Sequence, residues 1–269
     1  MEISPSQHGA PTRSQQDSTR GEARLSKPTY LPEDLTAELE IRVRALYADK
    51  SVLPQHNFEH VLQVREAVKP LIERCEKAGI PIDRVALDHA ILLHDLLYAV
   101  DHQKLGFESK EALSADYAEK LLLELGAPLE HARKVKEIIL ATHHQKEPQT
   151  PEEILIRAAD LSNLAGDYKS FRATTHRLHE ESRINGNAGI SFQEFVVRSY
   201  RFLSFFTASQ LELTDGARTS DGKSEWHENV FSNLQRLHAE AFGTEEQSVL
   251  VIVGREALDR VMLEPPRAG

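Results

Sequence analysis

Residues 88–100 read DHAILLHDLLYAV, an apolar run that two ionisable residues interrupt, His94 and Asp95. The apolar residues recur with the period of an α-helix, and His94 falls on their stripe, so this pair is predicted to face a core. Burying such a pair costs several kcal/mol, as an order of magnitude, unless charge or hydrogen bonds compensate. Because neighbouring side chains on a helix diverge, we expect the pair to meet a shared third partner, such as a metal ion, rather than each other.

A period near 3.6 residues continues from residue 35 through nearly every later segment, and none alternates like a half-buried strand over a useful length. We therefore predict an all-α fold, with Gly79, Gly126 and Pro151 as helix stop and start signals. Residues 248–254, SVLVIVG, are the one segment that could form a short strand instead. The predicted helices cover residues 33–48, 57–78, 83–99, 109–125, 128–144, 151–165, 168–184, 191–210, 225–241 and 245–260.

Composition excludes several functional classes. A single cysteine, Cys75, rules out an internal disulfide framework and indicates a reducing, cytoplasmic compartment; on its apolar stripe it is predicted to be buried. The N-terminus lacks the apolar centre of a secretory signal, and nowhere do 18 apolar residues run together, so we expect no membrane segment. With 32 Lys plus Arg against 42 Asp plus Glu, the net charge of -10 argues against binding a nucleic-acid polymer.

Two further polar residues occupy core-facing helix positions. In QHNFEHVLQV, residues 55–64, His60 lies one turn before Val64 on the apolar face. In EEILIRAADLSN, residues 152–163, Asp160 also lies on the inward face. Taken alone, the histidine could be a satisfied core residue and the aspartate a helix cap.

Together, His60, His94, Asp95 and Asp160 supply two imidazoles and two carboxylates from three helices. This mixed nitrogen and oxygen donor set suits one or two divalent ions with open water positions, namely Mn, Fe, Co, Zn or Mg, and not a closed structural zinc site. An ion of this kind binds phosphate oxygens and lowers the pKa of a bound water. A catalytic metal site is therefore predicted.

The order of these residues, His, then His-Asp, then Asp, resembles the HD-domain superfamily of metal-dependent phosphohydrolases. HNFEH at 56–60 is similar to the HNxxH of cyclic-nucleotide phosphodiesterases, and ADLSN at 159–163 is similar to the string around their last metal aspartate. Residues 94–122, followed by ATHHQ at 141–145, look more like small bacterial HD phosphohydrolases. The resemblance implies an HD-domain helical bundle with additional C-terminal helices, in which the four residues above are the metal ligands.

The resemblance also implies roles for residues around the metal. His56 would be the general acid that protonates the leaving oxygen, and Asp95 would bridge a second ion if one binds. Glu108 and His143 or His144 would line the pocket. From its place at the start of a helix, Glu108 is a candidate either for orienting the attacking water or for complementing the helix dipole.

Three more residues are candidates for substrate contact. Asn163 lies one turn after Asp160, and Lys146 and Arg172 carry positive charges that a phosphate group could use. Isolated basic residues on helices are usually surface charge, which is the alternative for the last two.

The function that we expect is hydrolysis of a small phosphate ester or anhydride, with a nucleotide or another phosphorylated metabolite as substrate. One alternative is a mixed-valence di-iron HD-domain oxygenase, which needs extra histidines such as His143 and His144. Another is a non-catalytic HD module that binds a nucleotide or a partner protein.

Domain organisation follows from composition along the chain. Residues 1–27 are rich in Ser, Gln, Gly and Pro, which is typical of a disordered tail. Residues 28–269 are predicted to form one domain, since 40% hydrophobic content is enough for a sizeable core. Its metal-binding core would span about 50–185, and C-terminal helices over about 190–262 would complete the bundle or form a homodimer face.

Overall fold

The structure, a computed structural model, describes residues 32–48, 53–186, 188–203, 206, 210–214 and 217–243. The predicted tail over 1–27, the predicted helix over 245–260 and the alternative strand over 248–254 lie outside these residues. The described residues form helices and no strand, which confirms the all-α prediction. Among the described helices, none combines the length and apolar character that crossing a membrane requires.

Nine α-helices and two short 3-10 helices follow one another along the described residues. In chain order they are α1 (Pro32–Ala48), α2 (Phe58–Lys77), α3 (Arg84–Leu93), η1 (Gln103–Leu105), α4 (Lys110–Glu124), α5 (Leu129–Leu140), α6 (Pro151–Asp160), η2 (Ser162–Ala165), α7 (Tyr168–Ile184), α8 (Phe192–Leu203) and α9 (Glu225–Phe242). The predicted range for α7 is the observed one, and those for α1, α2, α4 and α9 are within one residue of it.

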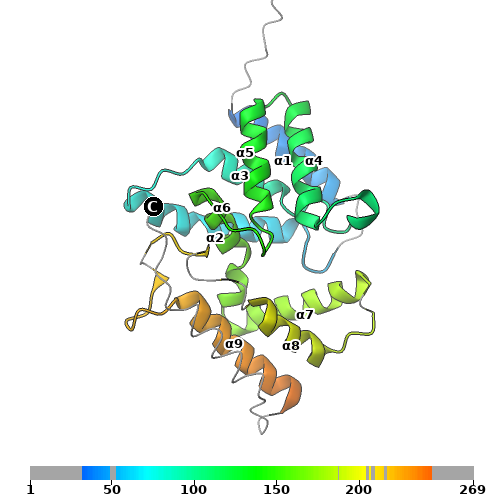
Figure 1. The fold of residues 1–269 in the computed structure, drawn as a ribbon, viewed down its shortest axis with the longest axis vertical. Coiled ribbons are helices and arrows are strands. Elements are labelled where there is room, and N and C mark those ends of the chain that lie inside the picture. The colour runs from blue at the N-terminus through cyan, green and yellow to red at the C-terminus, as the bar shows by residue number, and fades with distance from the viewer. Residues whose placement is uncertain are drawn as a thin grey trace, which may run out of the picture.

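The helices pack around two main hydrophobic cores, one toward each end of the molecule (Figure 1). Apolar side chains of α1 to α6 make the larger core, which includes the buried Cys75. Side chains of α7, α8 and α9 make a second core. Representative buried residues are Leu39, Val64, Ile91, Leu122, Ile139 and Ile156 in the larger core, and Phe171, Val196 and Leu234 in the second.

Capping residues and a glycine set the boundaries of α2 and the start of α6. The side chain of Asn57 caps α2 by accepting a hydrogen bond from the backbone N–H of His60. The helix ends where Gly79 adopts a φ of 77°, a conformation that favours glycine. Thr150 caps α6 in the same way, and Pro151 is its first residue, as predicted.

Helix α3 ends six residues earlier than predicted, directly before the buried ionisable pair. Residues 94–99 form tight turns, in which the N–H of Tyr98 donates to the carbonyl of Asp95 at 3.0 Å. Because the chain leaves the helix here, Asp95 turns back and its Oδ2 lies 3.0 Å from Nε2 of His94. The prediction that these neighbouring side chains diverge was therefore wrong.

Helix α5 is also shorter than predicted, and a buried arginine explains where it stops. Arg157 of α6 is 1% exposed, and its guanidinium donates to the carbonyls of Ala141, His143 and Lys146. These carbonyls follow the last turn of α5, and that of His143 also accepts the backbone N–H of Lys146. Tertiary hydrogen bonds thus replace further helical ones, in a way that local sequence does not reveal.

His89 of α3 is a buried polar residue that lies apart from the His94 pair. It is 0% exposed, with Nε2 at 2.8 Å from Oγ1 of Thr36 and Nδ1 at 2.9 Å from Nε2 of His131. Burial, together with the charge of His131, lowers the pKa of His89 from 6.5 to about 4. The neutral ring therefore joins α1, α3 and α5 through two hydrogen bonds.

This arrangement predicts a stability loss on mild acidification. The unfolded chain binds the proton first as the pH falls below 6.5, so the contribution of His89 is complete at neutral pH and is lost between about pH 6.5 and pH 4. Between pH 7 and pH 5, the wild type should lose about 2 kcal/mol more unfolding free energy than His89→Asn, measured in urea. His102→Asn, at the turn before η1, serves as the control, and its unfolding free energy should change between pH 7 and pH 5 by the same amount as that of the wild type. An equal loss in His89→Asn would contradict the prediction.

Candidate metal centre

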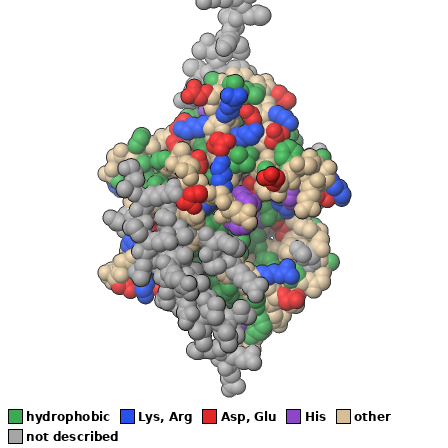
Figure 2. All heavy atoms as spheres, viewed as in Figure 1, with side chains coloured by type: hydrophobic (Ala, Val, Ile, Leu, Met, Phe, Trp, Pro, Cys, Tyr) green, Lys and Arg blue, Asp and Glu red, His purple; other side chains and the backbone are tan. Residues whose placement is uncertain are grey.

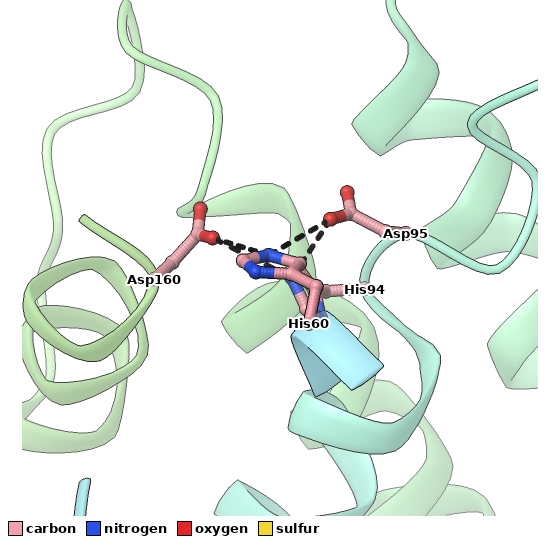
Figure 3. Close-up of side chains that lie close together, drawn as sticks. All are labelled: His60, His94, Asp95 and Asp160. Atoms are coloured by element: carbon pink, nitrogen blue, oxygen red, sulfur yellow. Dashed lines mark hydrogen bonds and ion pairs between the residues drawn. The ribbon is translucent and has the colours of Figure 1, made fainter. Parts of the chain in front are cut away.

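Four side chains from three separate helical segments converge on one point (Figure 3). His60 comes from the first turn of α2, His94 and Asp95 from the turn after α3, and Asp160 from the last position of α6. One ligand atom of each residue lies within 4.8 Å of the other three. The structure therefore brings together all four residues that were predicted as metal ligands.

The imidazoles of His60 and His94 lie between the two carboxylates (Figure 3). Nε2 of His60 is 3.0 Å from Oδ1 of Asp160 and 3.5 Å from Oδ2 of Asp95. Nε2 of His94 is 3.0 Å from the same Asp95 oxygen and 3.7 Å from the same Asp160 oxygen. Ligands about 2.1 Å from one ion, at a right angle, would be about 3.0 Å apart, so these separations suit a shared cation.

The cluster is enclosed on one side and open on the other. His60, His94 and Asp95 are 4%, 1% and 8% exposed. The side chain of Asp160 is 24% exposed. Solvent therefore reaches the cluster at Asp160, while the imidazoles are held in the core.

The pKa values of the cluster reflect mutual stabilisation of opposite charges. Burial lowers the pKa of His60, but hydrogen bonds to Asp160 and Asp95 outweigh burial and raise it to about 9. Burial also acts against ionisation of the two aspartates, yet the charges of His94 and His56 hold the pKa of Asp95 well below its usual range. The hydrogen bond from His60 likewise lowers the pKa of Asp160. Both carboxylates are therefore anionic at neutral pH.

One buried atom in the cluster lacks a hydrogen bond, and this tests whether the residues fit a metal ion. Nδ1 of His94 lies 2.9 Å from the carbonyl oxygen of Ile91 and donates to it. Nε2 of His94 then carries the ring's lone pair in the neutral form, and it has no hydrogen-bond partner of suitable geometry among the described residues. It faces a carboxylate oxygen of Asp95 at 3.0 Å. Two electron-rich atoms in this position need a positive charge between them. A proton or a divalent cation supplies that charge, so the four residues are suited to hold a divalent metal ion.

His56 lies beside the cluster in a position that three contacts define. Its ring stacks on Tyr98, with centroids 3.5 Å apart and planes 14° apart, and its centroid lies 5.7 Å from that of His60. Nδ1 of His56 pairs with Oε1 of Glu181, and the other oxygen of Glu181 accepts the backbone N–H groups of Gln55 and His56, each at 3.0 Å. The ring can therefore neither rotate nor shift without breaking buried contacts.

Sequence reasoning missed Glu181. This residue of α7 is 2% exposed. Burial raises its pKa, but the hydrogen bond and charge of His56 outweigh burial and lower it, so Glu181 is a buried carboxylate. A signal was present, because Glu181 follows Phe171, Thr174 and Leu178 at helical spacing and so lies on the inward stripe of α7.

Sequence reasoning also missed Gln55 and Arg177, which support the cluster from the side of His60. Nε2 of Gln55 lies 3.4 Å from Nδ1 of His60, and Oε1 of Gln55 accepts a hydrogen bond from Arg177 at 2.9 Å. Arg177 donates in turn to the hydroxyl of Thr174 at 3.0 Å. Helix α7 thus contacts His56 directly and reaches the outer side of His60 through Gln55.

The other predicted pocket residues do not join the four ligands. Glu108 is exposed just before Ser109, the N-cap of α4, and no described contact links it to the cluster. His143 and His144 face each other with ring centroids 4.7 Å apart, and His144 also faces Phe202 at 6.0 Å.

The predicted substrate contacts are occupied by protein partners. Nζ of Lys146 lies 2.6 Å from Glu137. Nε of Arg172 lies 2.7 Å from Glu240. The amide of Asn163 donates to Oε1 of Gln63 at 3.1 Å and so ties η2 to α2, one turn beyond the contact of His60 with Asp160.

Two cavities adjoin this region, and Tyr98 lines both. A cavity of about 410 Å³ is lined by the end of α1, the start of α2 and the turn after α3, including His56 and Asp95 themselves. A cavity of about 440 Å³ is lined by α7, α8 and α9, and reaches His56 only through its partners Tyr98 and Glu181. Both are large enough for a small metabolite.

Comparison with known proteins gives one result that bears on this site. The model of the HD domain family matches residues 57–162. The match begins at the cap of α2 and ends two residues after Asp160, so it contains all four converging residues. Comparison of the chain with curated proteins and with solved structures gave no match.

The cluster predicts stabilisation by a divalent cation. In protein stripped with EDTA, Mn²⁺ at about one hundred times its dissociation constant should raise the unfolding free energy by about 2.7 kcal/mol, because only the folded chain presents the four ligands together. Asp160→Asn should lose most of this gain. Asp101→Asn, at an exposed carboxylate seven residues from His94, should keep it. An equal gain in all three proteins would show that the ion binds elsewhere.

Proposed function

Because residues 57–162 of this chain form an HD domain, we propose that the protein is a metal-dependent hydrolase of small phosphate esters or anhydrides, with nucleotides as its first candidate substrates. The observation that carries this proposal is the convergence of two histidines and two aspartates within 4.8 Å, with one buried imidazole nitrogen that lacks a hydrogen bond. HD domains are generally metal-dependent phosphohydrolases, and this donor set is the one that such chemistry needs.

The four ligands would fix a divalent ion at the inner end of the site. When bound, such an ion neutralises phosphate charge and lowers the pKa of a coordinated water. The carbonyl of Ile91 keeps His94 in the tautomer whose Nε2 faces the cluster. Asp95 and Asp160 bring two negative charges that attract the cation, and the exposed side of Asp160 leaves room for the phosphoryl group.

His56 is suited to deliver a proton to the leaving oxygen. Glu181 occupies Nδ1 of His56, so Nε2 is the nitrogen that remains for the substrate. Tyr98 holds the plane of the ring by stacking, and the ring lies next to His60. A positioned general acid of this kind contributes about 10²- to 10⁴-fold to rate.

A small substrate in the cytoplasm is favoured over a nucleic-acid polymer. The chain carries a net charge of -10, and Figure 2 shows acidic and basic side chains interspersed over α4 and α5 on the face in view. Such a surface offers a phosphate backbone no broad attraction. The substrate would instead be recognised locally, at the metal centre.

The oxygenase alternative has less support from the site. It requires histidines beyond those of the HD pair, and His143 and His144 are not members of the converging group among the described residues. A non-catalytic module would retain metal binding without turnover. Measurements of bound iron and of oxygen consumption would identify an oxygenase. The phosphate-release experiment below would identify a non-catalytic module.

Asp95→Ala should abolish phosphate release. Purified protein is assayed for phosphate release from a panel of nucleotides and other phosphorylated metabolites with Mn, Co, Mg and Zn ions. Removing Asp95 deletes a ligand that contacts both histidines, so turnover should fall to background while circular dichroism shows an intact helical fold. Asp101→Ala is the matched control and should remain active. Unchanged turnover in Asp95→Ala would refute the proposed function.

Glu181→Gln should impair the proton donor without affecting the metal. The amide keeps an oxygen for the backbone N–H groups of Gln55 and His56 but removes the charge that pairs with His56. We expect kcat to fall roughly ten- to hundredfold with the Mn²⁺ affinity unchanged. Glu180→Gln, at the exposed neighbouring position, should behave like the wild type. A variant Glu181→Gln with full kcat would contradict the assignment of His56 as general acid.

A further inference from the structure

The cavity of about 440 Å³ lies behind Tyr98 as seen from His56. The imidazole of His56 stacks on the ring of Tyr98, with centroids 3.5 Å apart and planes 14° apart, and the ammonium of Lys110 lies 3.7 Å from the same centroid. Two groups this close to one ring centroid occupy opposite faces of the ring, because a single face has no room for both. Tyr98 therefore separates His56 from Lys110, and of the two large cavities Lys110 lines only the larger.

Apolar side chains of the three C-terminal helices line much of this cavity. They include Phe171 and Leu178 of α7, Phe195 and Leu203 of α8, and Leu234 of α9. None of the four converging histidines and aspartates is in its wall. A ligand in this cavity would thus bury an apolar body without reaching the metal centre.

Lys110, the first residue of α4, carries a charge that no carboxylate neutralises by direct contact. The face of Tyr98 is its near partner, and among the described residues no ion pair or hydrogen bond involves its Nζ. The residue is half-buried, and burial lowers its pKa because burial disfavours the charged form. Nζ is nevertheless not one of the buried polar atoms that are closed to solvent, so a ligand can reach it.

The other charges in the wall also favour an anion. Arg198 of α8 is an exposed residue that lines the cavity, and no described carboxylate forms an ion pair with it either. The acidic residue of the wall, Glu181, is paired with His56 and accepts two backbone N–H groups. A cavity with two uncompensated cations and one engaged carboxylate attracts a negatively charged group.

We propose that this cavity is a second ligand site, separate from the metal centre, which takes a small anion with an apolar body, such as an aryl or acyl carboxylate, sulfonate or phosphate. The anionic group pairs with Lys110, and the apolar body packs against the side chains of α7 and α8. Binding there does not depend on the proposed function. The site adjoins that function, because Tyr98 and Glu181 line the cavity and also hold the ring of His56. An occupant would therefore contact both residues that fix His56.

Calorimetry on the full chain, stripped of metal with EDTA, tests the site without turnover. The probe is naphthalene-2-sulfonate, and its comparison is naphthalene-2-sulfonamide, which has the same apolar body without the charge. The wild type should bind the sulfonate roughly ten- to hundredfold more tightly than the sulfonamide, because only the sulfonate pairs with Lys110. Lys110→Met keeps an unbranched apolar stem and should bind both probes equally weakly. Added Mn²⁺ should leave the affinity for the sulfonate unchanged, since no metal ligand lines the cavity.

Lys104→Met is the matched control, at an exposed lysine of η1 that lines neither cavity, and it should bind the sulfonate like the wild type. Leu178→Trp fills the cavity with a larger side chain and should abolish binding, with urea unfolding as the check that the variant folds.

The inference is overturned if the wild type binds no sulfonate or binds both probes equally. It is also overturned if Lys110→Met binds the sulfonate as tightly as the wild type, if Lys104→Met loses as much affinity, or if a folded Leu178→Trp still binds. If the sulfonate binds as expected but no phosphorylated metabolite is hydrolysed, the proposed function fails and the inference stands.

Discussion

The arrangement of this site depends on one electrostatic requirement, a positive charge between the buried Nε2 of His94 and the oxygen of Asp95 that faces it at 3.0 Å. The backbone around the cluster is consistent with that requirement. Helices α3 and α6 both end at the cluster, and the C-terminus of a helix carries a partial negative charge that favours a cation. The early end of α3 also allows Asp95 to approach the centre. The side chains and the helix termini thus both favour a cation at the cluster.

The four converging residues could be picked out from sequence because each one breaks a local pattern. An imidazole or carboxylate on an apolar helical stripe is visible in a window of a dozen residues, as at His60 and Asp160. The residues that support the ligands could not be predicted in this way. Glu181 contacts His56 across 125 positions of the chain, and Arg157 ends α5 from the following helix. Such contacts depend on how helices pack, and no local period encodes them.

Buried polar residues in this protein fall into two kinds, which differ in their consequences. Both ring nitrogens of His89 have hydrogen-bond partners on neighbouring helices, so this residue holds the bundle together. Among the described residues, His94 and Tyr47 each keep one buried polar atom without a hydrogen-bond partner, and both lie at or beside the candidate site. A missing partner alone does not identify a site, because Tyr200 in the second core shares it. What distinguishes the first two is their position beside convergent charges and a cavity.

The candidate site extends beyond residues 57–162, which match the HD domain family. The four converging residues lie within residues 57–162, but His56 precedes that range and is held by Glu181, which follows it. Helix α7 reaches both His56 and, through Arg177 and Gln55, His60. Helix α7 also packs into the second core with α8 and α9. The C-terminal helices therefore contribute to the candidate site through α7, because a shift of that helix would displace His56 and, through Gln55, His60.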